Sequence, residues 1–511
     1  YGRPQTLPDS FLLMFFPHPA RRETRLQRAS MTAFGRPRPR GAAVSIRECL
    51  QKEGTPMNRM LREKSFYKTF AILTLSLALQ NLLTYSVNMA DNIMLGRFSQ
   101  DALSGASLCN QLQFFLQMLV QGVGEGVVVL GARYWGKKDL KHIPHIIGAG
   151  LRFGVAIAVL MFLAALFFPE QIIRLMSNDE AIVEQGVQYL QIICFTYVLF
   201  ALTNMLTASL RTIGIVKIGY MISASTLCIN ICLNYVLIYG HFGAPALGVR
   251  GAAIATLVSR AVELLIVIWY LKFREHTLNL NWRKLLFIDT SYIKDYIHVS
   301  LPVLITQALW GFSSIVQTAV LGNMDNSAMV VPANSISVLV FQILSVVGYG
   351  AASAAAILTG RTLGEGKKER IDQTAFTFQV LFCIIGVFTG LIIFFSRGPV
   401  MMIYDTLTPE AAELTQQFIT VLAITSVGTC YQMAADSGIL RAGGDTRFAM
   451  WNNMVFTWLI CLPCAILSAF VFHFPPVVVF FCLKMDQLGK CPVIFLRVRS
   501  KKWIKQITRQ S

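Results

Sequence analysis

Charged residues are scarce in this chain. They make up 14% of its 511 residues, hydrophobic residues make up 54%, and the mean hydropathy is +0.55. A soluble globular domain carries about 25% charged residues, so the composition excludes an ordinary water-soluble protein, and it also excludes a disordered chain, a collagen or a coiled coil. The long apolar runs, rich in Phe and Met, instead predict an integral membrane protein that sits in a lipid bilayer.

Motifs of enzyme and pump chemistry are also missing. The phosphate-binding pattern Gly-x-x-x-x-Gly-Lys-[Ser/Thr] does not occur, which argues against an ATP-driven pump. The seven histidines are scattered in the first segment, in loops or near span ends, at positions 18, 142, 145, 241, 276, 298 and 473. No His, Ser or paired-acid constellation predicts an active site, so we expect a protein that is not an enzyme and that needs no cofactor.

The arrangement of the cysteines does not indicate a disulfide framework, a redox site or a zinc site. Six of the eleven cysteines lie inside apolar runs, where they read as small apolar side chains: Cys194, Cys228, Cys232, Cys383, Cys461 and Cys464. The last two have the spacing of a redox motif, but neither a second pair nor a histidine cluster accompanies them. We therefore predict neither a disulfide framework nor a redox or zinc site.

Residues 1–56 differ from the rest of the chain. They contain ten Lys or Arg residues, and their one apolar run, residues 11–16, is too short for a signal-peptide core or a membrane span. Met57 opens a basic stretch directly before the first long apolar segment. We expect the functional protein to start near Met57, after translated upstream sequence, and a disordered regulatory tail is the alternative.

Twelve apolar segments after Met57 are long enough to span a bilayer. Their approximate centres are Leu79, Leu116, Ala158, Phe195, Ile229, Val262, Thr306, Leu344, Ile385, Ala423, Leu459 and Phe480. Backbone polar groups must be satisfied internally in lipid, which leaves helices or a closed barrel, and runs of this length exclude the barrel. The predicted fold is therefore all-α with twelve transmembrane helices.

Basic residues alternate between the loops that join these spans. The second, fourth, sixth, eighth and tenth loops are rich in Lys and Arg, as are both ends of the helical region, whereas the intervening loops carry few basic residues and several acids. Under the positive-inside rule, the basic loops and both termini are cytoplasmic in a multi-pass protein of the cell membrane. Because the charge is divided among loops, nucleic acid is not an expected partner.

The chain repeats once in the same order. The matching pairs are Leu95-Gly96 with Leu321-Gly322, Asn110 with Asn334, Gly122-x-Gly124 with Gly348-x-Gly350, Arg133-x-Trp135-Gly136 with Arg361-x-Leu363-Gly364, and Leu210-Arg211-x-x-Gly214 with Leu440-Arg441-x-x-Gly444. Glycines recur in any helical bundle, which explains single matches but not five in order. The repeat predicts two six-helix lobes, residues 57–284 and 285–511, related by a pseudo-twofold axis around a central cleft.

Some of these stretches resemble the multidrug and toxic compound extrusion (MATE) family. The resemblance lies in Asp91-Asn92-Ile93-Met94-Leu95-Gly96, Leu210-Arg211-Thr212-Ile213-Gly214, Asn234-Tyr235-Val236-Leu237-Ile238-Tyr239-Gly240, Gly248-Val249-Arg250-Gly251-Ala252-Ala253-Ile254-Ala255-Thr256 and Leu440-Arg441-Ala442-Gly443-Gly444-Asp445-Thr446. It covers about residues 65–507. It implies an antiporter that exports organic cations, often drugs, in exchange for H+ or Na+, by rocking two lobes between outward-open and inward-open states. Such a core can be complete as a monomer.

Asp91 is the first candidate for a coupling group. Placing a carboxylate at mid-membrane costs about 2.5–3.5 kcal/mol of free energy on insertion scales, so a carboxylate there indicates a functional or structural role. Asp91 lies near the outer end of the first span, one turn after Asn88, and an acid beside a low-dielectric cleft binds a proton or a cation readily. In the family, the matching Asp belongs to the cation or proton site of the first lobe. The alternative is a buried Asp that caps a helix end.

Asn230 and Asn234 form the expected surroundings of Asp91. Their i, i+4 spacing places both on one face of the fifth span, where they could meet Asp91 across the lobe, with Asn88 as a further polar neighbour. Some family members carry an Asp at the position of Asn234, so here Asp91 is the obvious titrating group. The alternative is a pair of Asn residues that only hydrogen-bond between helices.

The second half has no acid at the matching position. The repeat places Gln317 opposite Asp91, and with Gln307 it could line a polar cleft of the second lobe. The acid nearest the tenth span is Asp436, close to the cytoplasmic end, which weakens a sodium site in this lobe. Ser76 stands where the repeat has Pro302, so a mechanism that requires a proline bend in the first span is in doubt.

Three other charged residues have structural interpretations. Glu125, between Gly124 and Gly126, is expected to reach the cytoplasmic interface, and Arg260 and Glu263 are spaced i, i+3 as an ion pair.

A cation-coupled exporter of organic cations is the leading hypothesis. A flippase or exporter of lipid-linked saccharides, or of another metabolite, on a related fold is the alternative. It predicts extra spans and a strongly cationic cleft, and neither is evident.

Overall fold

The computed structural model describes residues 60–176, 179–275, 277, 290–324, 327–366, 368–403 and 408–507. The chain divides into two units, Tyr1–Thr55 and Pro56–Ser511. The predicted extension and the start near Met57 lie outside the described residues. Every helix given below belongs to the second unit, and the described part of the chain contains no strand.

The first half of the unit is a series of helices joined by short turns. They are α3 (Lys64–Phe98), α4 (Gln100–Gly136), α5 (Ile143–Phe167), α6 (Pro169–Arg174), α7 (Glu180–Ile193), α8 (Phe195–Thr212), α9 (Lys217–Tyr239) and α10 (Val249–Phe273). Ser99 separates α3 from α4 in an extended conformation, and its side chain accepts a hydrogen bond from the Ala102 amide. Gly240 ends α9 at φ 75°, a backbone conformation that glycine adopts without strain.

The second half continues with a larger number of helices, several of them short. They are α12 (Thr290–Gly322), α13 (Ser327–Leu344), α14 (Val346–Glu365), α15 (Lys368–Phe395), α16 (Arg397–Ile403), α17 (Pro409–Ala435), α18 (Thr446–Met454), α19 (Leu462–Phe470), α20 (Pro476–Lys484) and α21 (Asp486–Arg499). Two π-helical segments interrupt this series: η3 (Asp436–Arg441) follows α17, and η4 (Val455–Cys461) joins α18 to α19. Such segments are frequent at functional sites.

Nine helical stretches of the described residues are long and apolar enough to cross a membrane. Two further spans, α7 with α8 and α13 with α14, are each bent by 46°, and counting each bent pair as one span gives up to eleven. The twelfth predicted span, near Phe480, falls on α20 and α21, which are 9 and 14 residues long and meet at charged residues. The count of twelve stays a prediction.

Proline does not distinguish the first spans of the two halves. Ser76 lies within an unbroken α3, as expected, but α12 also runs through Pro302 without a break. The hydroxyl of Thr306 donates to the Pro302 carbonyl, 2.8 Å away, which satisfies one backbone acceptor of that turn.

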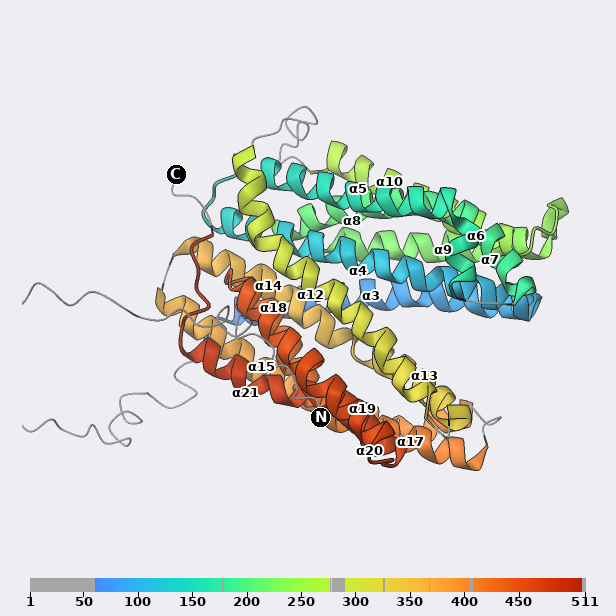
Figure 1. The fold of residues 1–511 in the computed structure, drawn as a ribbon. Helices are drawn as coiled ribbons and strands as arrows, with labels where there is room; N and C mark the ends of the chain where they lie inside the picture. Colours follow the sequence, from blue (N-terminus) through green and yellow to red (C-terminus); the bar gives the residue numbers. More distant parts are fainter. Residues whose placement is uncertain are drawn as a thin grey trace, which may run out of the picture. The chain divides into compact units, whose positions relative to one another are not determined.

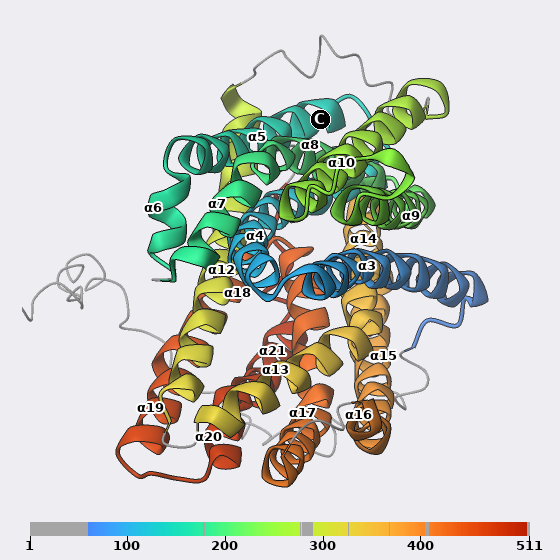
Figure 2. The ribbon, with the colours of Figure 1, turned by 90° about the vertical axis from the view of Figure 1, so that its right-hand side faces the viewer.

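The helices of the two halves form two groups in Figure 1 and Figure 2. Helices α5 to α10 gather in one group, and α15 and α17 to α21 in the other. The helices α4 and α17, together with η3, bury more of their length than the other spans do. Helix α12 packs against α4, and α14 packs against both α3 and α4, so these contacts join the two groups. The predicted pseudo-twofold relation between the halves stays a prediction.

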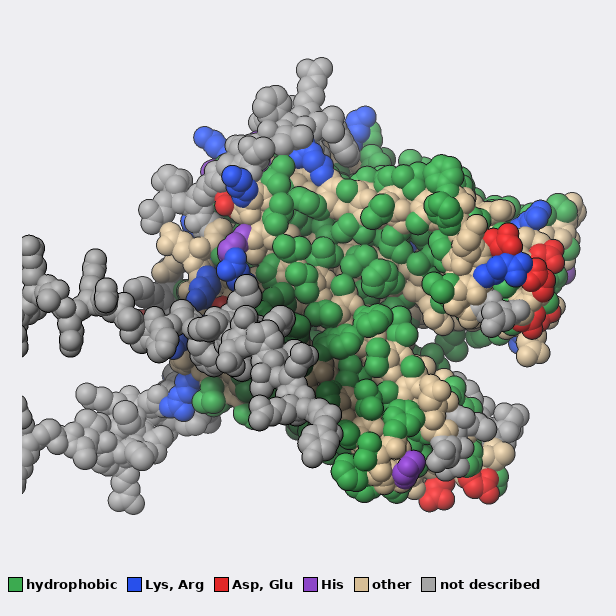
Figure 3. All heavy atoms as spheres, in the orientation of Figure 1, with side chains coloured by type: hydrophobic (Ala, Val, Ile, Leu, Met, Phe, Trp, Pro, Cys, Tyr) green, Lys and Arg blue, Asp and Glu red, His purple; other side chains and the backbone are tan. Residues whose placement is uncertain are grey.

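The surface fits a bilayer environment. Figure 3 shows apolar side chains over the middle of this face, with Lys and Arg gathered toward the left end and Asp and Glu toward the right end. Large apolar side chains are exposed along the helices, such as Leu75 at 71%, Leu160 at 70% and Phe395 at 72%. Exposed apolar area on this scale is typical of a lipid-facing surface. At the right end of Figure 3 the surface is hollowed between the two groups of helices.

Candidate functional site

Asp91 lies at the centre of a buried polar cluster between α3, α9 and α10. Its Oδ1 atom accepts a hydrogen bond from the Asn234 side-chain amide at 2.5 Å, and its Oδ2 atom accepts one from the Thr256 hydroxyl at 3.4 Å. Asn234 also donates to Asn230 at 3.2 Å, and Asn230 donates to Thr256 at 3.2 Å. The four side chains form a closed ring of hydrogen bonds.

The ring is almost inaccessible to solvent. Asp91 is 5% exposed, Asn230 and Asn234 are 0% exposed, and Thr256 is 6% exposed. The i, i+4 spacing of the two Asn residues on α9 turns both side chains toward α3, where Asp91 faces them. The structure therefore brings Asp91, Asn230 and Asn234 together as the sequence predicted.

The ring contains no positive charge. All direct partners of the Asp91 carboxylate among the described residues are neutral. The Oδ1 atom of Asn234 is buried and accepts no hydrogen bond within the described structure. The Asp91 carboxylate and the unused carbonyl oxygen of Asn234 therefore lack a positively charged partner in direct contact. A proton or a small cation bound between them would supply that positive charge.

The residues of this site differ from the prediction at two positions, Asn88 and Thr256. Asn88 is exposed, and among the described residues no hydrogen bond joins it to Asp91. Thr256 on α10 is an additional member that the sequence interpretation missed. The stretch around Thr256 was quoted for its family resemblance, but a single Thr in an apolar helix carries no pattern that marks it as polar lining.

The ion pair predicted on α10 is present. Arg260 Nη1 lies 2.7 Å from Glu263 Oε2, and both side chains are 11% exposed. Arg260 follows Thr256 by four residues on the same helix, so the nearest cation to Asp91 on this helix is already held by its own acid.

Gln307 and Gln317 do not form one site. They are ten residues apart on α12, which corresponds to a rise of about 15 Å. Gln307 packs against Gly122 of α4. Gln317 accepts a hydrogen bond from Lys484 of α20 at 3.0 Å, in a different part of the second half. These contacts place the two side chains in different parts of the second half, and a polar cleft that both of them line stays a prediction.

Glu125 has an ion-pair partner that the sequence did not predict. Rather than only reaching an interface, its Oε2 atom lies 2.8 Å from Arg441 Nη1, and Arg441 Nη2 lies 2.8 Å from Asp436 Oδ2. Asn453 donates to Asp436 at 3.3 Å. This chain of contacts links α4 of the first half to η3 and α18 of the second half.

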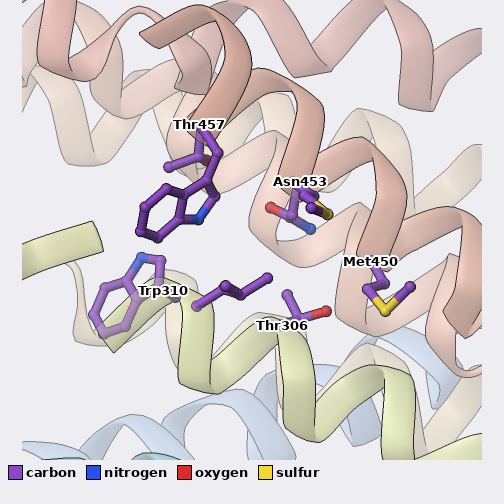
Figure 4. Close-up of a pocket in the computed structure, with 8 residues that line it drawn as sticks. Thr306, Trp310, Met450, Asn453 and Thr457 are labelled. Atoms are coloured by element: carbon purple, nitrogen blue, oxygen red, sulfur yellow. The ribbon is translucent and has the colours of Figure 1, made fainter. Parts of the chain in front are cut away.

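A small cavity adjoins this chain, between α12 and the α18–η4 segment (Figure 4). Thr306 and Trp310 of α12 face Met450, Asn453 and Thr457 across it. Its volume of about 20 Å³ gives room for about one water molecule. It is therefore too small to hold an organic substrate in this conformation.

Two hydrogen bonds between the halves join residues that are counterparts in the sequence repeat. Arg361 donates through Nη2 to the carbonyl oxygen of Ile213, and Arg133 donates through Nη2 to the carbonyl oxygen of Gly443. Arg133 and Arg361 are counterparts in the sequence repeat, and so are Ile213 and Gly443. Each half thus supplies an arginine to the equivalent carbonyl of the other half.

The helices α4 and α14 meet next to these arginines at two glycines. A Cβ atom added to Gly136 would overlap the Arg361 carbonyl oxygen, and one added to Gly364 would overlap the Arg133 carbonyl oxygen. The backbones of the two halves are therefore in direct contact. We call this region, Arg133 to Gly136 with Arg361 to Gly364, the arginine end.

Metal-binding chemistry is not visible in the described residues. No group of three or more His, Cys, Asp or Glu side chains among them lies close enough to hold a metal ion.

Comparison with known proteins agrees with this architecture. The sequence model of the MatE family matches residues 76–236 and 302–467. The probable multidrug resistance protein NorM of Thermotoga maritima is 26% identical over 437 residues, covering 84% of this chain and 92% of NorM. The uncharacterized transporter YisQ of Bacillus subtilis is 22% identical over 448 residues, covering 86% of this chain and 96% of YisQ.

Solved structures share the fold. The eukaryotic MATE transporter AtDTX14 superposes with a TM-score of 0.78 at 18% identity, covering 87% of this chain and 97% of that one. An outward-facing multidrug resistance MATE transporter gives a TM-score of 0.78 at 18% identity, covering 86% and 98%. Since the family match covers most of both halves of the helical unit, the chain belongs to the MatE family of multidrug and toxic compound extrusion transporters.

Proposed function

We propose that this protein is an antiporter that exports organic cations across the cell membrane in exchange for H+ or Na+, and that Asp91 binds the coupling ion. Its relatives include proteins named as multidrug resistance transporters. The observation that carries the coupling role is the buried Asp91 carboxylate, which has only neutral direct partners, beside the unused Oδ1 atom of Asn234.

Binding of the coupling ion changes the charge of the first lobe. A proton on Asp91 gives the ring an additional donor, for which the Asn234 Oδ1 atom is a free acceptor. A sodium ion, as the exchanged ion, is satisfied by the same oxygen atoms. In either case the negative charge that would attract a cationic substrate is neutralised, so ion and substrate compete and are exchanged.

Movement of the two lobes completes the proposed cycle. The chain is inserted as a monomer with twelve spans and with both termini in the cytoplasm, so the arginine end faces the cytoplasm. The arginine end is closed, whereas the surface is hollowed between the helix groups at the opposite end. Alternating access then requires the hydrogen bonds of the arginine end to break when the lobes rock inward.

Transport in proteoliposomes tests the proposal. The full chain is reconstituted, and export of rhodamine 123, a cationic dye, is followed under an imposed H+ gradient and separately under a Na+ gradient. We expect one gradient to drive export, and Asp91→Asn to abolish gradient-driven export because Asn cannot take up a proton or balance a cation.

A matched control keeps the test specific. Asp101 is an exposed acid in the first turn of α4, so Asp101→Asn removes the same charge from the same half without touching the ring. It should export like the wild type. Export by Asp91→Asn at the wild-type rate, or export that neither gradient drives, would contradict the proposal.

A further inference from the structure

A lysine lies between the helices of the second half without an acidic partner. Lys484 ends α20, and its ammonium donates to Gln317 of α12 at 3.0 Å. It also lies 5.6 Å from the centre of the Phe480 ring. No carboxylate of the described residues lies within ion-pair distance of this ammonium. An ionisable residue of this kind in a membrane protein needs a functional reason.

The nearest acid in sequence is held by another lysine. Lys490 Nζ lies 2.7 Å from Asp486 Oδ2, and the two side chains are 4% and 6% exposed. Thr457 donates to the same Asp486 oxygen at 3.1 Å, and Gln487 donates to its other oxygen at 2.9 Å. Asp486 thus accepts three hydrogen bonds and has Lys490 as its counter-ion, which leaves Lys484 as the surplus positive charge among these three residues.

Lys484 lines a cavity of about 230 Å³ between α12, α13 and α20. Several neutral polar side chains share the lining with it: Ser314, Gln317, Thr318, Asn334 and Ser335. Hydroxyl and amide groups donate hydrogen bonds to an anion as readily as they accept them from a cation. A cavity of about 150 Å³ can hold a benzene ring, so this one has room for an aromatic carboxylate group.

The predicted repeat gives this pair a counterpart in the first half. Gln317 corresponds to Asp91, and the repeat motif nearest Thr256, Leu210-Arg211 with Leu440-Arg441, has an offset of 230, which pairs Thr256 with Asp486, two residues after Lys484. Thr256 donates to Asp91, and Lys484 donates to Gln317. The hydrogen bond from α10 to α3 in the first half thus ends on a carboxylate. The hydrogen bond from α20 to α12 in the second half instead comes from an ammonium.

We propose that the cavity at Lys484 binds the carboxylate of an exported substrate. This inference rests on the proposed export function and adds to it a preference, among organic cations, for those that also carry a carboxylate. The ammonium of Lys484 pairs with the carboxylate, and the side-chain amides of Gln317 on α12 and Asn334 on α13 donate to its remaining lone pairs. The substrate would supply the negative charge that the described residues do not place beside Lys484.

Two dyes that differ in a single group provide the test. Rhodamine 110 carries a free carboxylate, and rhodamine 123 is its methyl ester, so both keep the same cationic ring system. Their binding to the purified full chain in detergent is measured by fluorescence anisotropy, without any ion gradient. Wild type should bind the acid about tenfold or more tightly than the ester, as expected for a charge-assisted hydrogen bond in a partly dry cavity.

Variants locate the preference. Lys484→Met should bind the two dyes with equal affinity, while Lys484→Arg should keep the preference because the guanidinium also pairs with a carboxylate. Retained ester binding shows that the Met variant is folded. Equal binding of the two dyes by wild type needs no variant to interpret and would overturn the proposal, as would a preference that persists in Lys484→Met.

A lipid phosphate could offer similar chemistry to Lys484. The titration is therefore repeated with added phosphatidylglycerol. A lipid that displaces the acid dye but not the ester would assign the cavity to a headgroup and overturn the proposal. Export of the ester in the gradient experiment is independent of this result, so a failure of the carboxylate site leaves the proposed antiport intact, and a failure of antiport is recognised separately.

Discussion

Two buried acids, one in each half of the helical unit, have different surroundings. Asp91 in the first half is surrounded by neutral amides and a hydroxyl, whereas Asp486 in the second half is paired with the buried Lys490. A carboxylate with a fixed counter-ion has its charge compensated, and it gains little from a further cation. A carboxylate without one is open to a mobile cation. The comparison therefore separates a structural acid from an acid suited to coupling.

The same substitution in the two halves should have opposite effects on stability, and this is the largest effect we predict. Asp486→Asn leaves Lys490 buried without an anion and should lower the free energy of unfolding by about 3–5 kcal/mol. Asp91→Asn removes a charge that has no cationic partner in direct contact and should leave stability unchanged or raise it. Thermal unfolding of each purified variant in detergent measures both. Equal destabilisation by the two substitutions would show that Asp91, like Asp486, is a structural acid.

Substitution of one glycine should disrupt the backbone contact between the halves at the arginine end. Gly364→Ala places a methyl group against the Arg133 carbonyl, and separating α4 from α14 should cost about 1–3 kcal/mol. Gly311→Ala is the matched control, because a Cβ at Gly311 of α12 would meet only Phe115 and Met118 of α4, at 3.8 and 4.0 Å. It should be neutral or slightly stabilising in the same unfolding assay. A destabilised Gly311→Ala variant would show that helix packing in general, and not this contact, is sensitive.

A smaller effect should distinguish the two arginines. Arg361→Met removes a hydrogen bond to one carbonyl of the other half, at a cost of about 1 kcal/mol. Arg133 donates to the carbonyls of both Gly443 and Lys505, so Arg133→Met should cost about twice as much. Unfolding temperatures of the two variants give the comparison. A larger loss for Arg361→Met would contradict it.

Much of the fold follows from the sequence because lipid imposes strong rules. Long apolar runs had to be helices, and the i, i+4 spacing of Asn230 and Asn234 fixed a common face on α9. The ring with Asp91 was predictable for that reason. Its fourth member was not, because a single Thr in an apolar helix carries no polar spacing, and only the packing of α10 brings Thr256 near Asp91.

Sequence patterns are least informative where charges enter the last helices. Lys484, Asp486 and Lys490 interrupt the twelfth apolar run. The i, i+4 spacing of Asp486 and Lys490 favours an ion pair, but no spacing shows which groups outside these helices contact the two lysines. The answer depends on α12 and η4, which supply Gln317 to Lys484 and Thr457 to Lys490. In the same way, Glu125 was assigned to an interface because its partner, Arg441, lies 316 residues away. Local patterns do not contain contacts of this range.

The arginine end has a consequence for how the protein senses its surroundings. Arginine stays protonated at any physiological pH, and backbone carbonyl oxygens do not titrate. The paired hydrogen bonds from Arg133 and Arg361 to carbonyls of the other half therefore hold equally well in acidic and in neutral medium. The hydrogen bonds of the arginine end are thus chemically separate from the Asp91 carboxylate, which is proposed to bind the coupling ion. A change of transport rate with pH would then report on protonation of Asp91 and not on weaker hydrogen bonds at the arginine end.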